Sequence, residues 1–494
     1  MKENTQLNNA NNPTDRFQFS LPFFEEFVNK KGKNEIRISN PKLILFWESL
    51  GYRKVIDDAG NYILVNIERK TIVNEVKDHL LRSEIREYTR YIKRADVWEV
   101  FLKSEYVVKK HFESFHTIDM TRNTGDENTG YLYYQNVILK ITADSIEPIE
   151  YENFQGFVWG KEIIKRDFNF SEDAECIFGE FLRIIANEEP NRLKSIVSII
   201  GYLLHSFKDP SFSKSIILMD SEIDVEFDEA NGGTGKSLIG TAIGQIVPSL
   251  FMDGKNIKSQ DKFKLSGLQS HHKIIFFDDV KKDFDFEWLY PIITGDLYIE
   301  KKYKNAVVIP SKESPKVLIT SNYVVKGGGG NAERRRKVEY EVSTYFKNIL
   351  SPLEEFGHRF FDDWDKEEWI KFDNFMIKAV KYFLKNGLIE PKSINIDFNR
   401  LKIETSPDFI DFMDNLISEP SGYQKSSSPD ILIIDKNILF QDFLNTKPNT
   451  KERISPITIK KWIDRYCEYY QIPHNHYKSN GSVYVELNIS NINK

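Results

Sequence analysis

Residues 230–237, Ala-Asn-Gly-Gly-Thr-Gly-Lys-Ser, contain the residue types that bind a chain of phosphates beside a magnesium ion. Small residues let successive backbone N–H groups surround the phosphates, a lysine reaches the outer phosphates, and a serine hydroxyl holds Mg²⁺. The predicted phosphate-binding loop consists of Asn231, Gly232, Gly233, Thr234, Gly235, Lys236 and Ser237. Of these, Lys236 is the predicted phosphate-binding cation and Ser237 the predicted metal ligand.

The segments on both sides of this loop fit that role, with two departures. The apolar run 215–219 predicts a strand, and residues 238–246 predict a helix whose positive N-terminus faces the phosphates. About ten residues separate the strand from the loop, which is more than usual. A strict phosphate loop also has glycine where Ala230 stands, although another small residue can serve.

Two further apolar runs end in polar side chains that could complete the chemistry. Residues 273–277 precede Asp278 and Asp279. We predict that Asp278 helps to hold Mg²⁺ and that Asp279 orients or polarises an attacking water. Residues 315–321 precede Asn322, whose amide could hydrogen-bond the γ-phosphate or that water. Each segment alone is also typical of a core strand with a polar end, but their order after a phosphate loop favours a nucleotide site.

In this order, the motifs resemble those of the superfamily 3 helicases, such as the polyomavirus large T antigen and the helicase part of phage and poxvirus primase-helicases. The resemblance covers roughly residues 170–345. It implies a P-loop core of the AAA+ type that hydrolyses ATP with Mg²⁺ as its metal.

A further motif, residues 294–304, supports the resemblance because ordinary P-loop ATPases lack it. The family has a DNA-binding β-hairpin at this place, with a lysine followed by a histidine at its tip. Lys302 matches that lysine and Tyr303 replaces the histidine, so Tyr303 could stack on a base. The residues implied to bind DNA are Lys301, Lys302, Tyr303 and Lys304. A lysine-rich hairpin exposed to solvent is the alternative.

The resemblance also implies a ring of subunits. In this family an arginine just before the next strand, predicted here at residues 338–342, reaches the ATP site of the neighbouring subunit. The spacing indicates Arg335 or Arg336, with a surface basic cluster or a DNA contact as the alternative for each. An arginine acting in trans requires a homo-oligomer. The family implies a hexamer that encircles DNA and moves 3′ to 5′ along a single strand.

The whole chain is predicted to be a multidomain α/β protein, because its 494 residues exceed what one hydrophobic core supports. We expect a disordered tail (1–14), a mixed α/β N-terminal domain of unknown role (15–165), a helical collar for oligomerisation (166–210), the ATPase core (211–345), a helical region (346–418), a linker (419–429) and a winged-helix-like DNA-binding domain (430–494).

Local patterns predict several elements inside the two outer domains. In the first domain they indicate a hairpin at 52–68, a helix at 71–81 and a strand pair at 131–141. In the last they indicate helices from 436 and from 455, then a hairpin at 477–485 around an Asn-Gly turn. Lys460, Lys461, Arg465 and Lys478 could meet DNA phosphates, although winged helices also bind proteins.

Composition limits the partners. A net charge of −6 means that DNA contact must come from local basic patches. Cys176 and Cys467 are far apart, which excludes a disulfide framework or a cysteine zinc site and fits a cytoplasmic protein. No stretch approaches the roughly 20 apolar residues that a membrane span needs, so no membrane partner is expected. His474 and His476 could share one side of a strand, and we interpret them as a surface feature.

Three functions are compatible with these patterns. The favoured hypothesis is a helicase that acts in replication of a phage, plasmid or mobile element. The second is an origin-binding initiator whose ATPase drives assembly and not processive unwinding. The third is a protein-remodelling AAA+ ATPase, against which the hairpin lysines argue. Because residues 15–165 contain no recognisable primase site, we expect any primase to act in trans.

Overall fold

The computed structural model describes residues 15–18, 20–56, 62–103, 113–172, 175–209, 211–222, 233–282, 284–300, 302, 306–325, 331–420, 424–425, 430–446, 454–479 and 481–490. The expected tail, residues 1–14, lies outside them.

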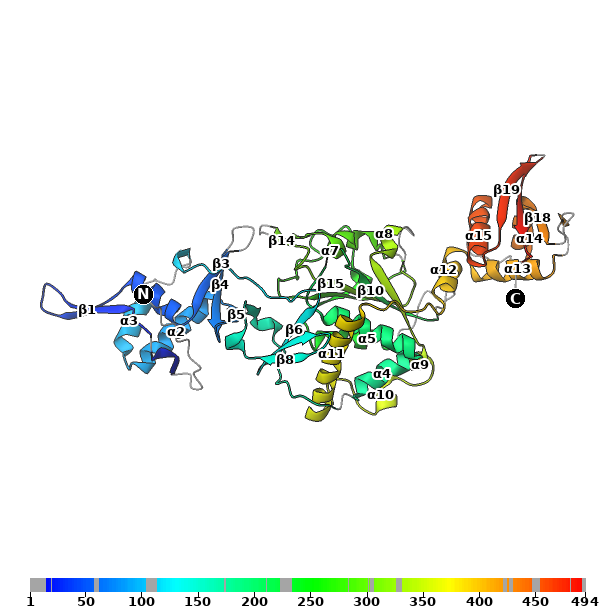
Figure 1. Cartoon of the computed structure of the whole chain (residues 1–494). Coiled ribbons are helices and arrows are strands. Elements are labelled where there is room, and N and C mark those ends of the chain that lie inside the picture. The colour runs from blue at the N-terminus through cyan, green and yellow to red at the C-terminus, as the bar shows by residue number, and fades with distance from the viewer. Residues whose placement is uncertain are drawn as a thin grey trace.

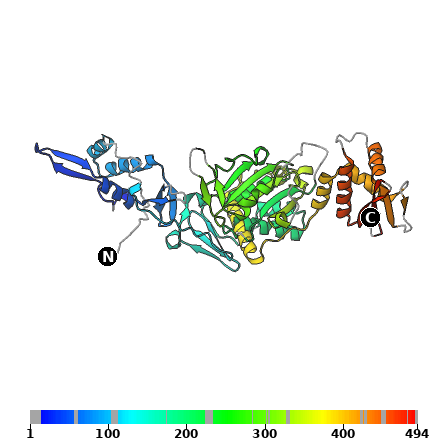
Figure 2. The same cartoon turned by 90° about the horizontal axis from the view of Figure 1, so that it is seen from above.

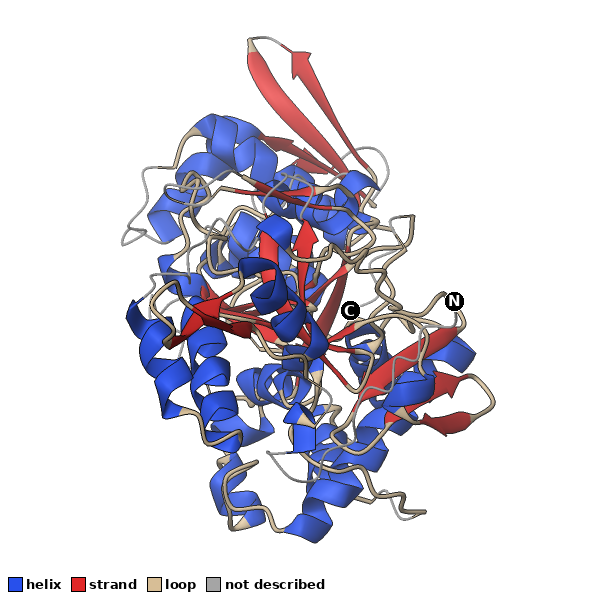
Figure 3. Ribbon diagram, turned by 90° about the vertical axis from the view of Figure 1, so that its left-hand side faces the viewer, coloured by secondary structure: helices blue, strands red, loops and turns tan. Residues whose placement is uncertain are grey.

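The chain is a multidomain α/β protein, as predicted. Its buried hydrophobic residues form separate clusters near the N-terminus, in the middle and near the C-terminus. Figure 1 and Figure 2 show these N-terminal, central and C-terminal parts following one another in a row. Helices and strands occur together throughout the molecule (Figure 3).

The N-terminal part surrounds a cluster that runs from Phe17 to Phe115 and buries Trp47 completely. Its elements are β1 (Phe24–Val28), β2 (Asn34–Ile38), α1 (Asn40–Ser49), β3 (Tyr52–Ile56), β4 (Tyr62–Glu68), β5 (Ile72–Glu75), α2 (Asp78–Tyr91) and α3 (Ala95–Lys103). The predicted pairing of β3 with β4 is confirmed.

The helix predicted at 71–81 is wrong, because its first half is a strand. β5 pairs with β4 in antiparallel orientation, and the helix α2 begins only at Asp78. Thr71, Ile72 and Val73 are all β-branched. Branching at Cβ restricts χ1 and favours the extended backbone of a pleated sheet.

A small antiparallel sheet follows, in the order β6-β7-β8, together with β9 (Val158–Trp159), which pairs with β5. Its strands are β6 (Thr129–Tyr133), β7 (Ile138–Thr142) and β8 (Ile146–Ile149). Leu132, Leu139 and Ile141 of this sheet belong to the central hydrophobic cluster and not to the N-terminal one. The region 15–165, predicted as one domain, therefore contributes to three separate clusters, the third of which is small and includes Ile72 and Val158.

The central part contains a parallel sheet with the strand order β11-β12-β15-β10-β16. Its strands are β10 (Ser215–Asp220), β11 (Ser249–Asp253), β12 (Ile274–Val280), β15 (Lys316–Ser321) and β16 (Lys337–Val342). Every residue of β10 and β15 is buried, which matches their continuous apolar sequences and the covering of both sheet faces.

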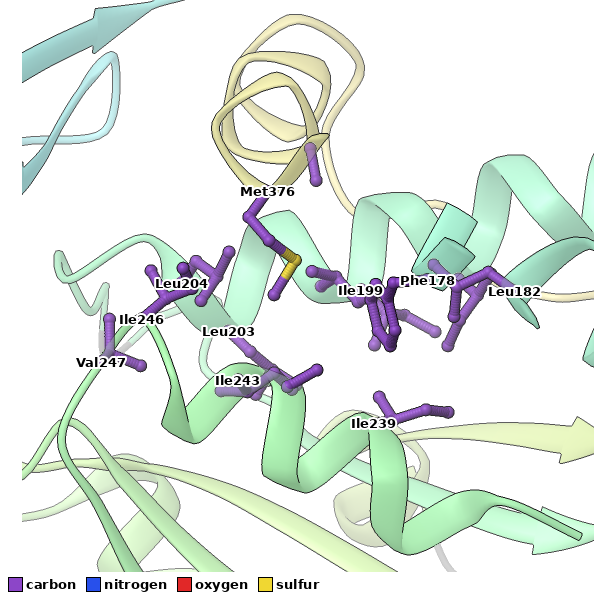
Figure 4. Packing of buried hydrophobic residues seen from close by; sticks show 14 of the residues in the cluster. Phe178, Leu182, Ile199, Leu203, Leu204, Ile239, Ile243, Ile246, Val247 and Met376 are labelled. Atoms are coloured by element: carbon purple, nitrogen blue, oxygen red, sulfur yellow. The ribbon is translucent and has the colours of Figure 1, made fainter. Parts of the chain in front are cut away.

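The helices of the central part lie around its sheet. They are α4 (Ile177–Ile185), α5 (Pro190–Leu204), α6 (Lys236–Gly244), α7 (Tyr290–Thr294), α8 (Asn331–Arg334), α9 (Tyr345–Asn348), α10 (Pro352–Phe356) and α11 (Lys366–Asn386). Of these, α6, α7 and α8 contact the strands of the sheet directly. Figure 4 shows Ile239 and Ile243 of α6 facing the apolar side chains of α4 and α5, with Met376 of α11 behind them. The segment predicted as a collar therefore packs on the helix that follows the phosphate loop.

The C-terminal part has its own core, which includes Phe409, Trp462 and Val485. Its elements are α12 (Ile396–Glu404), α13 (Pro407–Ser418), β17 (Gln424–Lys425), β18 (Ile431–Asp435), α14 (Lys436–Thr446), α15 (Pro456–Tyr469), β19 (His474–Ser479) and β20 (Ser482–Asn488). Both predicted helices are present as α14 and α15. The predicted hairpin is the pair β19 and β20, which belongs to a sheet of order β17-β18-β20-β19.

The predicted linker, 419–429, does not separate this part from the rest as expected. Residues 421–423 and 426–429 lie outside the described residues, but Gln424 and Lys425 pair with β18. α13, which precedes the linker, supplies Phe409 and Met413 to the C-terminal core. Among the helices described here, none combines the length and apolar character that a membrane crossing requires.

Candidate nucleotide site

The candidate site lies where β10, β12 and β15 end. Because these strands are parallel and adjacent, their carboxyl ends share one edge of the sheet, where α/β proteins usually bind ligands. Asp220 ends β10, Asp278 and Asp279 lie near the end of β12, and Asn322 directly follows β15. α6 begins at Lys236, so its positive N-terminus completes the edge.

Lys236 is the centre of this arrangement and is only 6% exposed. Its ammonium donates hydrogen bonds to the Asp220 carboxylate, to Thr234 Oγ1 at 2.9 Å and to Asn322 Oδ1 at 3.0 Å. Thr234 also donates to Asp220 Oδ1 at 2.6 Å. The lysine predicted to bind phosphate is thus held by side chains from the ends of two strands.

Burial lowers the pKa of Lys236, and the nearby Lys347 acts in the same direction. Asp220 and Asp279 oppose this effect, because their negative charges stabilise the ammonium form. Asp220 itself is 2% exposed. A buried cation and a buried anion therefore compensate one another next to the phosphate loop.

The loop requires glycine at Gly235, for two reasons. Its φ is +88°, a left-handed conformation that side chains disfavour. A Cβ at this position would also stand 2.7 Å from a ring carbon of the buried Phe181. The neighbouring Gly233 likewise has a positive φ, of +123°. Both glycines of the described end of the loop therefore have a backbone conformation that favours glycine.

An irregularity in β12 lets two consecutive carboxylates reach the site. In a regular strand, neighbouring side chains point to opposite faces. Here the pairing with β15 shifts between Phe277 and Val280, and Asp279 has a φ of +55°. Asp278 then accepts hydrogen bonds from Ser237 at 2.7 Å and Thr320 at 2.6 Å. A bulge of this kind re-aims side chains beside functional sites.

Asp279 faces the side-chain amide of Asn322. Asn322 Nδ2 donates to Asp279 Oδ1 at 2.9 Å. The second carboxylate oxygen, Oδ2, lies 2.6 Å from the ammonium of Lys255. Asp279 raises the pKa of Lys255 by accepting this hydrogen bond. The Asp279 N–H donates to Thr320 Oγ1 at 2.8 Å, which ties the two acidic residues to the same threonine.

Six of the predicted site residues therefore belong to one hydrogen-bond network, in which Thr320 joins Asp279 to Asp278: Thr234, Lys236, Asn322, Asp279, Asp278 and Ser237. Three residues of this network, Asp220, Thr320 and Lys255, were not predicted from the sequence. Asp220 and Thr320 carried a usable signal, because both are polar residues at the ends of the apolar runs that were identified as strands. Lys255 had no such signal, since it lies in the short turn Gly254–Asn256 after β11.

The donor set fits a nucleotide with a bound magnesium ion. Ser237 Oγ and Asp278 Oδ1 are hard oxygen donors of the type that Mg²⁺ prefers, and they lie 2.7 Å apart. Lys236 and the start of α6 supply positive charge on the same side. Two of the predicted loop residues, Asn231 and Gly232, lie outside the described residues.

The predicted hairpin is present as the antiparallel pair β13 (Leu297–Ile299) and β14 (Val307–Ile309). Three of its predicted contacts, Lys301, Tyr303 and Lys304, lie outside the described residues. Lys302 is exposed, and its ammonium lies 5.6 Å from the ring centroid of Phe263. Tyr298, which the sequence analysis did not single out, is 69% exposed on β13.

The two candidate arginines have different surroundings. Arg335 is exposed. Arg336 is half-buried, and its guanidinium carbon lies 4.8 Å from the ring centroid of Tyr290. The predicted strand after them is confirmed as β16, which begins at Lys337. Arg335 therefore has the freedom that a contact with a second subunit needs, whereas Arg336 is packed within its own subunit.

Comparisons with known proteins give partial likenesses. A family model described as a family of unknown function (DUF5906) matches residues 229–336, which is less than half of the chain. No curated protein matches. Among solved structures, the C-terminal region of NrS-1 is 14% identical with a TM-score of 0.43, covering 91% of this chain and 99% of the other.

Two further solved structures are similar over smaller shares. A JCV helicase with a bound small molecule is 14% identical with a TM-score of 0.27, covering 49% of this chain and 64% of the other. Drosophila ORC bound to DNA is 10% identical with a TM-score of 0.19, covering 66% of this chain and 93% of the other. At these scores the functional conclusions depend on the site itself.

Proposed function

We propose that this protein is an ATP-dependent DNA helicase. The observation that carries the proposal is the continuous hydrogen-bond chain from Lys236 through Asn322 and Asp279 to Asp278 and Ser237. These side chains come from the phosphate loop and from the ends of two adjacent parallel strands. A phosphate cation, a metal-binding pair and a water-orienting acid are the groups that phosphoryl transfer to water requires.

Each group has a defined task in this proposal. Lys236 binds the outer phosphates, and the backbone N–H groups at the start of α6 bind them from the same side. Ser237 and Asp278 hold Mg²⁺, which offsets the negative charge of the phosphates. Asp279 orients the attacking water and accepts its proton. Asn322 connects Lys236 to Asp279, so it keeps the phosphate-binding and water-orienting groups in register.

Movement along DNA would use the hairpin and a ring of subunits. In the proposed helicase, Lys302 and its hairpin neighbours contact the phosphates of a single strand inside a hexameric ring. Arg335 is the better candidate for the arginine that enters the neighbouring ATP site, because it is exposed while Arg336 is packed on Tyr290. The proposed direction, 3′ to 5′, is what the family resemblance implies.

The first experiment measures ATP hydrolysis and ATP-dependent unwinding of a labelled forked DNA duplex by the full chain. The test variant is Lys236→Ala, and the matched control is Lys258→Ala, which removes an exposed lysine. We expect both activities in the wild type and the control, and neither in Lys236→Ala. Unwinding that survives in Lys236→Ala would refute a motor driven from this site.

A second experiment tests the DNA contact. Lys302→Ala should abolish the stimulation of ATP hydrolysis by single-stranded DNA while the rate without DNA stays near that of the wild type. Lys312→Ala, an exposed lysine outside the hairpin, serves as the control. If DNA does not stimulate ATP hydrolysis by the wild type, or stimulates Lys302→Ala equally, the proposed helicase function is contradicted.

One observation favours a second candidate, the origin-binding initiator. In the C-terminal part, burial and then the nearby Lys460 and Lys478 lower the pKa of Lys436, while Asp464 opposes them. This basic group could bind DNA phosphates through a winged-helix-like domain. Arg465, also predicted for this role, instead pairs with Glu404 at 2.9 Å and Glu468 at 2.7 Å. An initiator would bind an origin fragment tightly but leave forked DNA intact, and a primase would act in trans in either case.

A further inference from the structure

Three potential metal ligands converge in the C-terminal part, far along the chain from the nucleotide site. His474 and His476 lie two residues apart on β19, so their side chains share one face of the strand. Asp464 comes from α15, which packs beside them. One ligand atom from each lies within 4.8 Å of the others, and this is the one such group among the described residues.

Both imidazoles point the same ring nitrogen at the same carboxylate oxygen. Nε2 of His476 lies 2.6 Å from Asp464 Oδ1, and Nε2 of His474 lies 3.3 Å from it. The ring centroids are 5.8 Å apart with an angle of 84° between the planes. The rings therefore approach the carboxylate from two directions and enclose a common point.

The other ring nitrogen of His474, Nδ1, faces a backbone carbonyl. Nδ1 lies 3.2 Å from the backbone carbonyl oxygen of Ile472, which can only accept a hydrogen bond. An Nδ1 that donates to this carbonyl leaves Nε2, which faces Asp464 Oδ1, as the nitrogen available to a metal ion. Metal-binding histidines commonly show this arrangement, with the second nitrogen fixed by a backbone carbonyl.

We propose that Asp464, His474 and His476 form a site for a divalent transition-metal ion, with Zn²⁺ as the best fit. Two imidazole nitrogens and one carboxylate oxygen are a ligand set that zinc uses. In a tetrahedral zinc site with bonds of about 2.0–2.1 Å, neighbouring ligand atoms are about 3.3 Å apart. The His474 contact already has this separation, and the His476 contact needs to open by less than 1 Å.

Local burial and charge set the properties of the site. The side chains of His474, His476 and Asp464 are 22%, 16% and 30% exposed, so an ion and one water can enter. The neighbouring cations are Lys436, which interacts with Asp464, and Lys460 and Lys478, which lie near Lys436. Their positive charges weaken the binding of a metal cation. We therefore expect lower affinity than at a closed site with four protein ligands. The preference for imidazole also disfavours Mg²⁺, which binds oxygen.

A bound ion would connect elements that pack only through side chains. α15 carries Trp462 and Ile463 in the C-terminal core, while β19 forms the edge of its sheet. A metal ion bound by Asp464 and by both histidines would fasten the hairpin of β19 and β20 to this helix. The site is therefore structural in this proposal, and it is independent of the proposed ATPase.

The experiment titrates the metal-free full chain with Zn²⁺ and separately with Co²⁺, in the presence of excess Mg²⁺ to occupy the nucleotide site. We expect about one ion per chain and, with Co²⁺, the visible absorption of a tetrahedral complex. His476→Ala and Asp464→Asn should each weaken binding at least tenfold. The double variant His271→Ala/His272→Ala should bind like the wild type.

The control pair is matched, because His271 and His272 are also adjacent imidazoles, with ring centroids 4.3 Å apart, but belong to no three-ligand group. Far-UV circular dichroism of each metal-free variant identifies any that fail to fold, and His474→Gln then replaces such a variant. Zinc binding that is equal in wild type and His476→Ala overturns the proposal. A wild type without the cobalt absorption also overturns it, since the two histidines and Asp464 would then contact one another without holding a metal ion.

Discussion

Asp220→Asn is the substitution that most directly tests how Lys236 is held before nucleotide binds. In the structure, the Asp220 carboxylate accepts hydrogen bonds from both Lys236 and Thr234. A lysine that binds phosphate must exchange this carboxylate for the ligand. The substitution removes the charge and keeps the shape, so it should destabilise the free protein and strengthen nucleotide binding.

Both magnitudes follow from burial. Asp220 is 2% and Lys236 is 6% exposed, so the pair is shielded from solvent. Removing one partner of a buried pair costs about 3–5 kcal/mol, and we expect about 3 kcal/mol because asparagine still accepts a hydrogen bond. That loss corresponds to about 6–12 °C in the unfolding midpoint of a 150–250-residue unit. A hydrogen bond to a charged group contributes about 1.5–3 kcal/mol, so its loss should tighten nucleotide binding at least tenfold.

Thermal unfolding without nucleotide measures the first effect, and titration with a fluorescent ATP analogue measures the second. Asp362→Asn, which changes an exposed aspartate of the same protein, should move neither quantity. The reasoning is refuted if Asp220→Asn binds the analogue as weakly as the wild type or more weakly. Asp220 would then orient Lys236 toward phosphate instead of competing for it.

Three other predictions test the core and the site. Gly240→Ala should lower the free energy of unfolding by about 1–3 kcal/mol, because a Cβ there would collide with the Phe276 ring. Chemical denaturation measures this change, and a decrease below about 0.5 kcal/mol would contradict the packing. Burial lowers the pKa of His205 to about 4, so the unfolded state takes up the proton first as the pH falls and stability is lost between about pH 6.5 and 4. Urea unfolding at pH 7 and 4.5 should show a loss that is roughly 2 kcal/mol larger in the wild type than in His205→Gln, because the variant lacks only the contribution of His205. Asn322→Ala should lower the steady-state rate of ATP hydrolysis about 100-fold, and a rate within threefold of the wild type would remove Asn322 from the proposed mechanism.

The order of the central strands along the chain was predictable from hydrophobicity. Fully buried parallel strands have continuous apolar sequences, and the runs ending at Asp278 and Asn322 have this character. Their polar ends then indicated the site before its geometry was known. By contrast, the helix predicted at 71–81 failed because a short apolar run with β-branched residues does not distinguish a strand from a helix by periodicity.

The surroundings of the predicted groups depended on tertiary structure. Asp220 is separated from Lys236 by sixteen positions, and the two meet only because α6 begins over the edge of the sheet at which β10 ends. The register shift in β12, which brings both Asp278 and Asp279 into the site, has no signature in the apolar run before it. Pairing and bulges depend on neighbouring strands, and a single sequence does not specify its neighbours.

The histidine pair illustrates the same division at the other end of the chain. Alternation along a strand predicted that His474 and His476 share a face, and β19 has that form. The third ligand, Asp464, belongs to a helix, and only the packing of α15 beside β19 brings it within 2.6 Å of His476. The sequence by itself determined the local elements and the chemical groups that they carry, because periodicity and side-chain type are local properties. Which groups meet was decided by tertiary packing, because strand order and helix docking depend on contacts between distant segments.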